Sequence, residues 1–104
     1  MAWHEVADES AVGDDEAIGV KVGDVPIAIV RAGGMLHAVN DVCTHQYALL
    51  SDGYVEDGCI ECPLHQGRFE LSTGKAMCAP VTDPIAVYPV KAEGGKILVE
   101  IAEK

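Results

Sequence analysis

The sequence contains no long apolar run and few basic residues. No hydrophobic segment approaches the ~20 residues that an α-helix needs to cross a bilayer, so no membrane-spanning helix is expected. Only 7 of the 104 residues are Lys or Arg, against 17 Asp and Glu, and the net charge is −10. An acidic chain repels a phosphate backbone, which excludes a nucleic-acid partner. It remains compatible with docking onto a basic surface of another protein.

The first ten residues also lack the basic cluster that begins a secretory signal. They carry Glu5, Asp8 and Glu9 and no Lys or Arg, so no signal peptide is expected and the predicted location is the cytoplasm. Thiols are normally reduced in that compartment. The four cysteines therefore indicate metal binding or redox chemistry more than disulfides.

Helical periodicity is missing as well, since the 11 Gly and 5 Pro interrupt every segment long enough for a helix. Short apolar segments alternate instead with turn residues such as Gly33-Gly34 and Gly94-Gly95, which is typical of antiparallel hairpins. The pattern predicts a single all-β domain, an antiparallel sandwich or small barrel. Strands are expected at Ile18–Val22, Pro26–Arg31, Met35–Asn40, Cys59–Cys62, Arg68–Leu71, Ile85–Ala92 and Lys96–Ile101, with an edge strand at Trp3–Ala7.

The cysteines and histidines include two compact mixed pairs. Cys43-Thr44-His45 lies in the longest stretch without a strand pattern, and 16 residues separate His45 from the second pair, Cys62-Pro63-Leu64-His65. Each pair offers one thiolate and one imidazole, and the spacing allows a hairpin to bring the two loops together. The candidate metal ligands are therefore Cys43, His45, Cys62 and His65.

A set of two Cys and two His suits either zinc or a [2Fe–2S] cluster. Zinc takes it as a tetrahedron, and zinc sites usually pair like ligands in sequence. A [2Fe–2S] cluster takes two Cys on one iron and two His on the other. Because each loop here supplies one ligand of each kind, the spacing favours the cluster over zinc.

At these two boxes the sequence resembles the Rieske [2Fe–2S] proteins. Further residues are similar to the small Rieske ferredoxins of bacterial aromatic-ring-hydroxylating dioxygenase systems, namely Ser51-Asp52-Gly53-Tyr54, Thr73-Gly74-Lys75, Pro80 and the segment 84–91. The resemblance covers essentially the whole chain. It implies one Rieske cluster and one domain over residues 1–104, with a basal β part at about 1–40 and 79–104. The small cluster-binding part, formed by two loops, would span about 41–78.

The resemblance also implies a function without catalysis by the chain itself. It suggests a one-electron carrier, expected as a monomer, that accepts electrons from a flavin-dependent NAD(P)H reductase. The electrons would pass to the terminal component of an aromatic-ring-hydroxylating dioxygenase through the exposed edge formed by His45 and His65. Two alternatives stay open: the small Rieske subunit of a nitrite reductase-type complex, and a zinc-stabilised structural domain.

Departures from the wider family predict a low reduction potential. High-potential Rieske proteins tie the two loops with a disulfide, whose half-cystines would fall at Ala48 and Leu64. Those relatives also donate hydroxyl hydrogen bonds to the cluster from positions matching Gly67 and Phe69, which carry no hydroxyl here. Fewer donors near the sulfurs stabilise the added electron less, so the potential falls.

The remaining cysteines and histidines are expected to be structural. Cys59 precedes Cys62 by three residues, yet no strand–helix context accompanies this CxxC, so a buried, inert Cys59 is expected. Cys78, His4 and His37 are likewise expected not to bind metal. Further expectations are a cluster-covering role for Pro80, Gln46 and Tyr47 near the cluster tip, and a packing or edge role for Trp3.

Overall fold

The computed structural model describes residues 2–42, 49–63, 67–77 and 84–101, and β-strands dominate it. The strands are β1 (Ala2–Asp8), β2 (Glu16–Val22), β3 (Val25–Ala32), β4 (Met35–Asn40), β5 (Tyr54–Glu56), β6 (Cys59–Glu61), β7 (Arg68–Glu70), β8 (Val87–Tyr88), β9 (Val90–Glu93) and β10 (Lys96–Ile101). Two short 3-10 helices, η1 (Glu9–Ala11) and η2 (Leu50–Asp52), complete the described elements. The prediction of an all-β antiparallel fold is confirmed.

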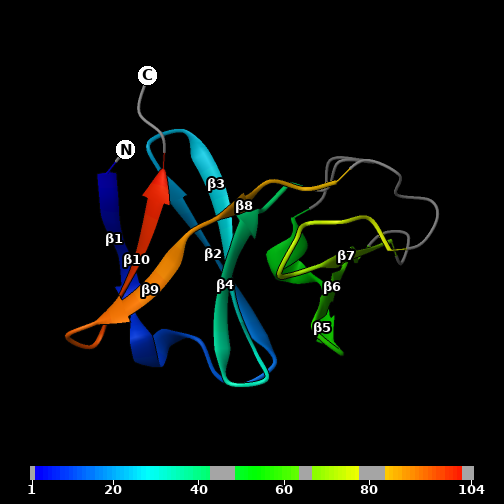
Figure 1. Cartoon of the computed structure of the whole chain (residues 1–104), viewed down its shortest axis with the longest axis horizontal. Coiled ribbons are helices and arrows are strands. Elements are labelled where there is room, and N and C mark those ends of the chain that lie inside the picture. Colours follow the sequence, from blue (N-terminus) through cyan, green and yellow to red (C-terminus); the bar gives the residue numbers. More distant parts are fainter. Residues whose placement is uncertain (1, 43–48, 64–66, 78–83, 102–104) are drawn as a thin grey trace.

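Three antiparallel sheets lie side by side in Figure 1. One sheet has the order β1-β10-β9, the middle sheet β2-β3-β4-β8, and the small sheet β5-β6-β7. The small sheet lies on the opposite side of the middle sheet from both chain ends (Figure 1). The predicted division into a basal part and a cluster-binding part at about 41–78 stays a prediction.

The middle sheet separates two hydrophobic cores, and β3 contributes to both. Ile27 and Ile29 face the core shared with Ile97 and Val99 of β10, while Ala28 and Val30 face the opposite side. All four β3 residues are fully buried, as expected for a strand covered on both faces. The second core, called here the loop-side core, also contains Ala32, Val39, Leu50, Ile60, Cys62, Phe69, Leu71 and Ile85.

Tight two-residue turns fix the register of the main hairpins. Gly33 and Gly34 have φ of 58° and 77°, the left-handed values that a type I′ turn requires. Their flanking residues pair directly, Ala32 with Met35, and the pairing continues to Ile27 and Asn40. The hairpin predicted at this Gly-Gly pair is therefore confirmed.

The predicted strand Ile85–Ala92 is wrong as a single element, because the chain changes sheets at Pro89. Val87 and Tyr88 form β8 and pair with β4, whereas Val90–Glu93 forms β9 and pairs with β10. Proline has no N–H to donate to a ladder, which makes it a natural break. The two short strands join the middle sheet to the sheet that carries both chain ends.

Strand β5 was not predicted, although its signal is present in the sequence. Tyr54–Glu56 pairs with Cys59–Glu61 across the turn Asp57-Gly58, an Asp-Gly dipeptide typical of hairpins. The preceding residues, Ser51-Asp52-Gly53, are typical of turns, so the sequence pattern indicates a loop where the strand begins.

The edge strand predicted at Trp3–Ala7 is confirmed as β1, at the edge of its sheet. Trp3 is 39% exposed, and the Nζ of Lys91 lies 4.3 Å from the centre of its ring. Trp3 is thus an edge residue whose ring contacts Lys91 of β9, the strand beyond β10 in the same sheet. Within the described part of the chain, no helix has the length and apolar character to span a membrane.

Candidate metal centre

The first predicted metal-binding loop leaves β4 at Asn40. Its two described flanks meet in a single antiparallel bridge between Val42 and Leu49. The Oδ1 atom of Asn40 accepts a hydrogen bond of 2.9 Å from the backbone N–H of Val42. The backbone N–H of Asn40 donates to the carbonyl of Ala86 at 2.9 Å, which joins this flank to the segment entering β8.

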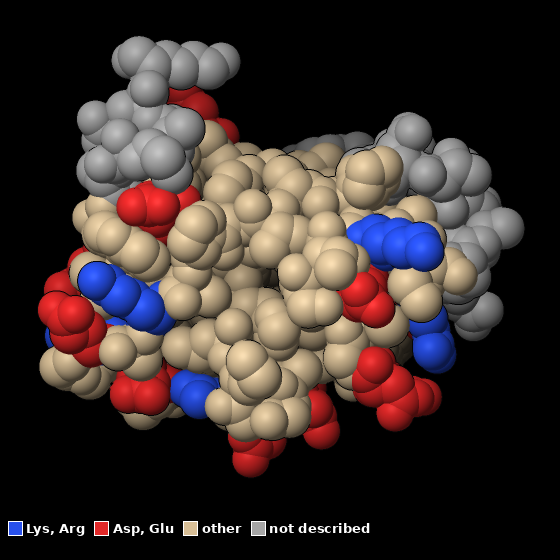
Figure 2. Space-filling view, in the orientation of Figure 1, with Lys and Arg blue, Asp and Glu red and all other residues tan. Residues whose placement is uncertain are grey.

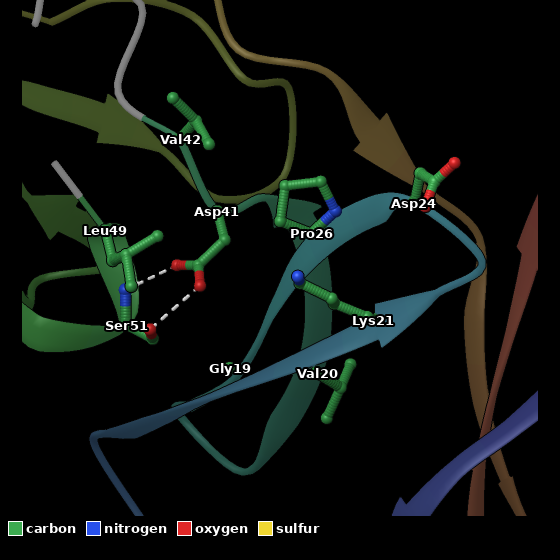
Figure 3. A pocket seen from close by; sticks show the side chains of 9 residues that line it. All are labelled: Gly19, Val20, Lys21, Asp24, Pro26, Asp41, Val42, Leu49 and Ser51. Atoms are coloured by element: carbon green, nitrogen blue, oxygen red, sulfur yellow. Dashed lines mark hydrogen bonds between the residues drawn. The ribbon is translucent and has the colours of Figure 1, made fainter. Parts of the chain in front are cut away.

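Asp41 closes the base of the same loop with its side chain. Its carboxylate accepts hydrogen bonds from the backbone N–H of Ser51 at 2.7 Å and from the Ser51 hydroxyl at 2.9 Å (Figure 3). Asp41 is only 3% exposed, and burial raises the pKa of its carboxyl above the usual value, against the lowering effect of the two Ser51 hydrogen bonds. A buried polar group therefore stands directly before the first ligand box.

The second predicted loop is the connection between β6 and β7. Glu61 pairs with Arg68 at the last rung of the ladder, and Arg68 also bonds the Glu61 carboxylate at 3.0 Å. One step further, the backbone N–H of Cys62 donates to the carbonyl of Gly67 at 2.7 Å. Both flanks of Leu64, His65 and Gln66 are thus held together.

A third segment approaches from the turn after β7. The N–H of Ile85 donates to the carbonyl of Gly74 at 2.8 Å, and the N–H of Met77 donates to the carbonyl of Arg68 at 2.8 Å. These bonds fix both described flanks of residues 78–83 against the small sheet.

All three loops leave from the loop-side core. Leu50, Cys62 and Ile85, each within two residues of a loop, are all buried in it. Loops anchored in one packed core have fixed base positions relative to one another. The described flanks therefore suit a site that takes ligands from separate segments.

Of the four predicted ligands, the structure places Cys62. It is fully buried beside Leu50 and Ile60, whereas Cys43, His45 and His65 lie outside the described residues. Ala48, Leu64, Gln46, Tyr47, Cys78 and Pro80 also lie outside them, so the expectations for these residues stay predictions. Across the described ranges, no three His, Cys, Asp or Glu residues gather as a metal site.

Cys59 differs clearly from Cys62 in its surroundings. Burial alternates along this segment, with Ile60 and Cys62 inside and Cys59 and Glu61 half-buried. Cys59 lines an open surface pocket with Tyr54, Glu56, Glu61 and Arg68. The expectation that Cys59 is buried is therefore wrong, because strand alternation turns it to the outer face of β6.

The two histidines outside the boxes lie on strands of the other sheets. His4 is half-buried on β1, and His37 is half-buried on β4 opposite Val30. Burial lowers the pKa of His37 below its usual value, so the neutral imidazole is favoured.

The residues present fit a [2Fe–2S] cluster. Cys62, the one predicted ligand among the described residues, is fully buried at the base of its box, so its sulfur is shielded from water. The predicted donor set of two thiolates and two imidazoles matches the Rieske type. The backbone bond from Cys62 to Gly67 holds the base of the box Cys62–His65.

The comparison with protein families decides between zinc and iron–sulfur. The sequence matches the Rieske [2Fe–2S] domain over residues 2–89. The chain belongs to the Rieske [2Fe–2S] family. The cofactor of this Rieske chain is one [2Fe–2S] cluster, and the zinc alternative loses its support.

Relatives of this Rieske chain are ferredoxins of dioxygenase systems. It is 44% identical over 99 residues to the anthranilate 1,2-dioxygenase ferredoxin subunit of Burkholderia cepacia, covering 95% of this chain and 92% of the relative. Its fold matches the ferredoxin of Sphingomonas yanoikuyae B1 with a TM-score of 0.91 and 31% identity, covering 97% and 100% of the two chains.

Two further solved structures bear on partners. A chain in the complex of reduced oxygenase and oxidized ferredoxin of carbazole 1,9a-dioxygenase matches with a TM-score of 0.86 and 36% identity, over 93% of this chain and 91% of that one. The small subunit of an NADH-dependent nitrite reductase from Mycobacterium tuberculosis matches with a TM-score of 0.86 and 25% identity, over 98% and 97%. The fold is thus common to both classes, while sequence identity is higher to the ferredoxin.

The Asp41–Ser51 contact is a feature of the site that the sequence did not predict. Its two residues are ten positions apart, and the intervening segment has no strand pattern. The sequence shows only that an Asp stands two residues before Cys43. The burial of Asp41, which the structure shows, is what indicates a partner, since ionisable residues are rarely buried without one.

Proposed function

We propose that this Rieske protein is a one-electron carrier between a flavin-dependent NAD(P)H reductase and the terminal oxygenase of an aromatic-ring-hydroxylating dioxygenase system. The observation that carries the proposal is 44% identity, over 95% of the chain, to a dioxygenase ferredoxin subunit. The chain serves as an electron-transfer component and not as the catalytic subunit. The similarity to a ferredoxin solved with its oxygenase supports the choice of acceptor.

Cys43, His45, Cys62 and His65 are the proposed ligands of the cluster. When bound, a Rieske cluster supplies a site that gains and loses one electron. The buried Cys62 would supply one of the two thiolates, and His45 and His65 would supply the two imidazoles. With four protein ligands, no iron position is open to a substrate, so the chain is limited to electron transfer.

Charge supports transient docking to basic partner surfaces. The net charge is −10, and on the face shown in Figure 2 the carboxylates lie along several edges instead of in one patch. A distributed charge steers encounter at long range and is screened by salt. A diffusing monomer in the cytoplasm fits this surface.

A reconstituted electron relay tests the proposal. The purified holoprotein is mixed with NADH and the flavin reductase and oxygenase of an anthranilate or a naphthalene dioxygenase system, and product formation is followed. We expect turnover to depend on the chain and to fall as salt is raised, because screening slows charge-steered encounter. Intact clusters that neither reductase reduces and neither oxygenase oxidises would contradict the proposal.

A fixed subunit of a nitrite reductase is the second candidate, favoured only by the fold it shares with such a small subunit. Expression in the source cell with an affinity tag separates the two. A carrier is recovered largely alone, whereas a fixed subunit is recovered in equal amounts with a large catalytic chain.

A further inference from the structure

The base of the first ligand loop is held by few main-chain contacts and by one side chain. The main-chain ladder there consists of one isolated bridge, Val42 with Leu49. Next to it, the Asp41 carbonyl accepts a hydrogen bond from the N–H of Leu50. The side chain of Asp41 adds two hydrogen bonds from Ser51 and so extends this short closure.

We propose that Asp41 is a positioning residue for the cluster. Through Ser51 its carboxylate fixes the base of loop 43–48, and so the placement of Cys43 and His45. The inference rests on the ligand assignment proposed above. It adds a residue that touches neither iron nor sulfur but determines how well two of the ligands are held.

The contacts of Asp41 connect η2 and β3 to the flank that follows β4. Its carboxylate holds η2 through the N–H and hydroxyl of Ser51, and its carbonyl accepts from the N–H of Leu50 at 2.7 Å. Its own N–H donates to the carbonyl of Pro26 in β3 at 3.0 Å. Both flanks of the loop are therefore fixed to each other and to the middle sheet, two residues before Cys43.

Strand β2 leaves space for this contact at Gly19. A Cβ added at Gly19 would lie 2.9 Å from the Asp41 Oδ2 atom and 2.9 Å from the Ser51 hydroxyl oxygen. Real Cβ atoms essentially never approach so closely, so any side chain at this position displaces the contact. A glycine inside a strand weakens it and often marks a close approach, which is the situation here.

A buried carboxylate is a costly choice for a purely structural contact. Desolvation of an ion is unfavourable, and an apolar replacement is often as stable or more so. Asp41 is 3% exposed at the wall of a pocket of about 700 Å³, beside Gly19 and Ser51 (Figure 3). Hydrogen bonds are directional, whereas apolar packing is not. The two short hydrogen bonds to Ser51 therefore restrict the geometry of the loop base more than apolar packing would, and this benefit offsets the cost.

Four variants of the holoprotein test the proposal. Asp41→Ala removes both hydrogen bonds, and Ser51→Ala removes only the hydroxyl bond, which keeps the test informative if the first variant folds poorly. Asp41→Asn retains both contacts, since the amide oxygen can accept from the Ser51 N–H and the amide nitrogen can donate to its hydroxyl. Asp24→Asn is the matched control, because Asp24 lines the same pocket but is exposed.

Three readouts separate positioning from simple stability: the g values of the reduced protein, the midpoint potential, and the rate of cluster loss in air. We expect Asp41→Ala to shift the g values and the potential and to lose its cluster about tenfold faster, the lower end of losses seen for supporting residues of metal sites. Ser51→Ala should shift the same readouts less. Asp41→Asn should restore the spectrum, and Asp24→Asn should match the parent protein.

Two outcomes overturn the proposal. Unchanged g values and potential in Asp41→Ala, whatever its unfolding midpoint, would leave Asp41 with a structural role only. Equal shifts in Asp41→Asn and Asp41→Ala would show that the charge acts, and not the hydrogen-bond geometry. A parent protein that binds no iron would instead contradict the proposed function, so the two failures are distinguishable.

Discussion

Cys59 and Cys62 lie three residues apart, yet strand alternation gives them opposite surroundings. Cys62 is fully buried in the loop-side core, and Cys59 faces a surface pocket. The mixed spacing of the two boxes predicts Cys62 as a ligand, and that assignment stays a prediction. The half-exposed position of Cys59 was not predictable without knowing which face of β6 is covered.

The two cysteines form a matched pair for substitution. We expect Cys62→Ser to reduce bound iron and sulfide at least about tenfold, because a buried ligand is removed. Cys59→Ser should retain the parent iron content and visible spectrum. Iron and acid-labile sulfide analysis of both purified variants measures this. Loss of the cluster in Cys59→Ser with retention in Cys62→Ser would contradict the ligand assignment.

His37 predicts a pH dependence of stability. Because burial lowers its pKa, the unfolded chain binds the proton first as pH falls. The free energy of unfolding should therefore decrease as pH drops below the usual pKa of 6.5, and the His37 contribution should be constant above it. Urea unfolding of the parent and His37→Gln at about pH 7.5 and about pH 5.5 measures the difference. Equal pH effects in both proteins would contradict this prediction.

Gly67 and Phe69 bear on the reduction potential. Both are buried in the structure and neither carries a hydroxyl, which suits the predicted lack of hydroxyl donors to the cluster. We expect a midpoint below about +100 mV, within the Rieske range of about −150 to +300 mV. A redox titration followed by visible spectroscopy measures it, and a value above that limit would contradict the prediction.

At the scale of elements, hairpin turns were the most predictable feature and strand switching the least. A type I′ turn requires positive φ at both central residues, and the glycines of Gly33-Gly34 adopt it without strain, so this dipeptide predicts the turn from local sequence. Pro89 ends a ladder by itself, but which sheets receive β8 and β9 depends on distant strands. The Asp41–Ser51 contact at the base of loop 43–48 was not predictable either, because its two residues are ten positions apart and no strand pattern connects them.

Gly74 and Gly23 test the element that anchors residues 78–83. Both have positive φ, of 77° and 60°. A Cβ at Gly74 would lie 2.1 Å from the carbonyl oxygen of Ile85, while a Cβ at Gly23 would meet nothing within 4 Å. We expect Gly23→Ala to cost roughly 1 kcal/mol of unfolding free energy. Gly74→Ala should cost about 3 kcal/mol or more, because backbone must also move.

Denaturant unfolding of the two glycine variants gives the comparison directly. Equal losses would mean that the close approach of Gly74 to Ile85 contributes nothing beyond the backbone conformation. In that case the flank of residues 78–83 would not be anchored at this point.

At the scale of the whole molecule, the middle sheet separates two hydrophobic cores, one on each of its faces. The loop-side core contains a buried residue next to each of the three loops. Composition and turn spacing were sufficient for the all-β class. The three-layer arrangement was not predictable, because β3 carries a continuous apolar run and its two faces are distinguished only by their neighbours. The small sheet, whose strand β6 directly precedes Cys62, lies on the side of the middle sheet opposite the chain ends (Figure 1).

The central claim is a Rieske cluster held by Cys43, His45, Cys62 and His65. Metal and sulfide analysis, with pulsed electron paramagnetic resonance of the dithionite-reduced protein, tests it most directly. We expect two iron and two sulfide per chain, as a [2Fe–2S] cluster requires, and hyperfine couplings from two imidazole nitrogens. A colourless protein with one zinc, or an iron–sulfur signal without nitrogen coupling, would contradict it.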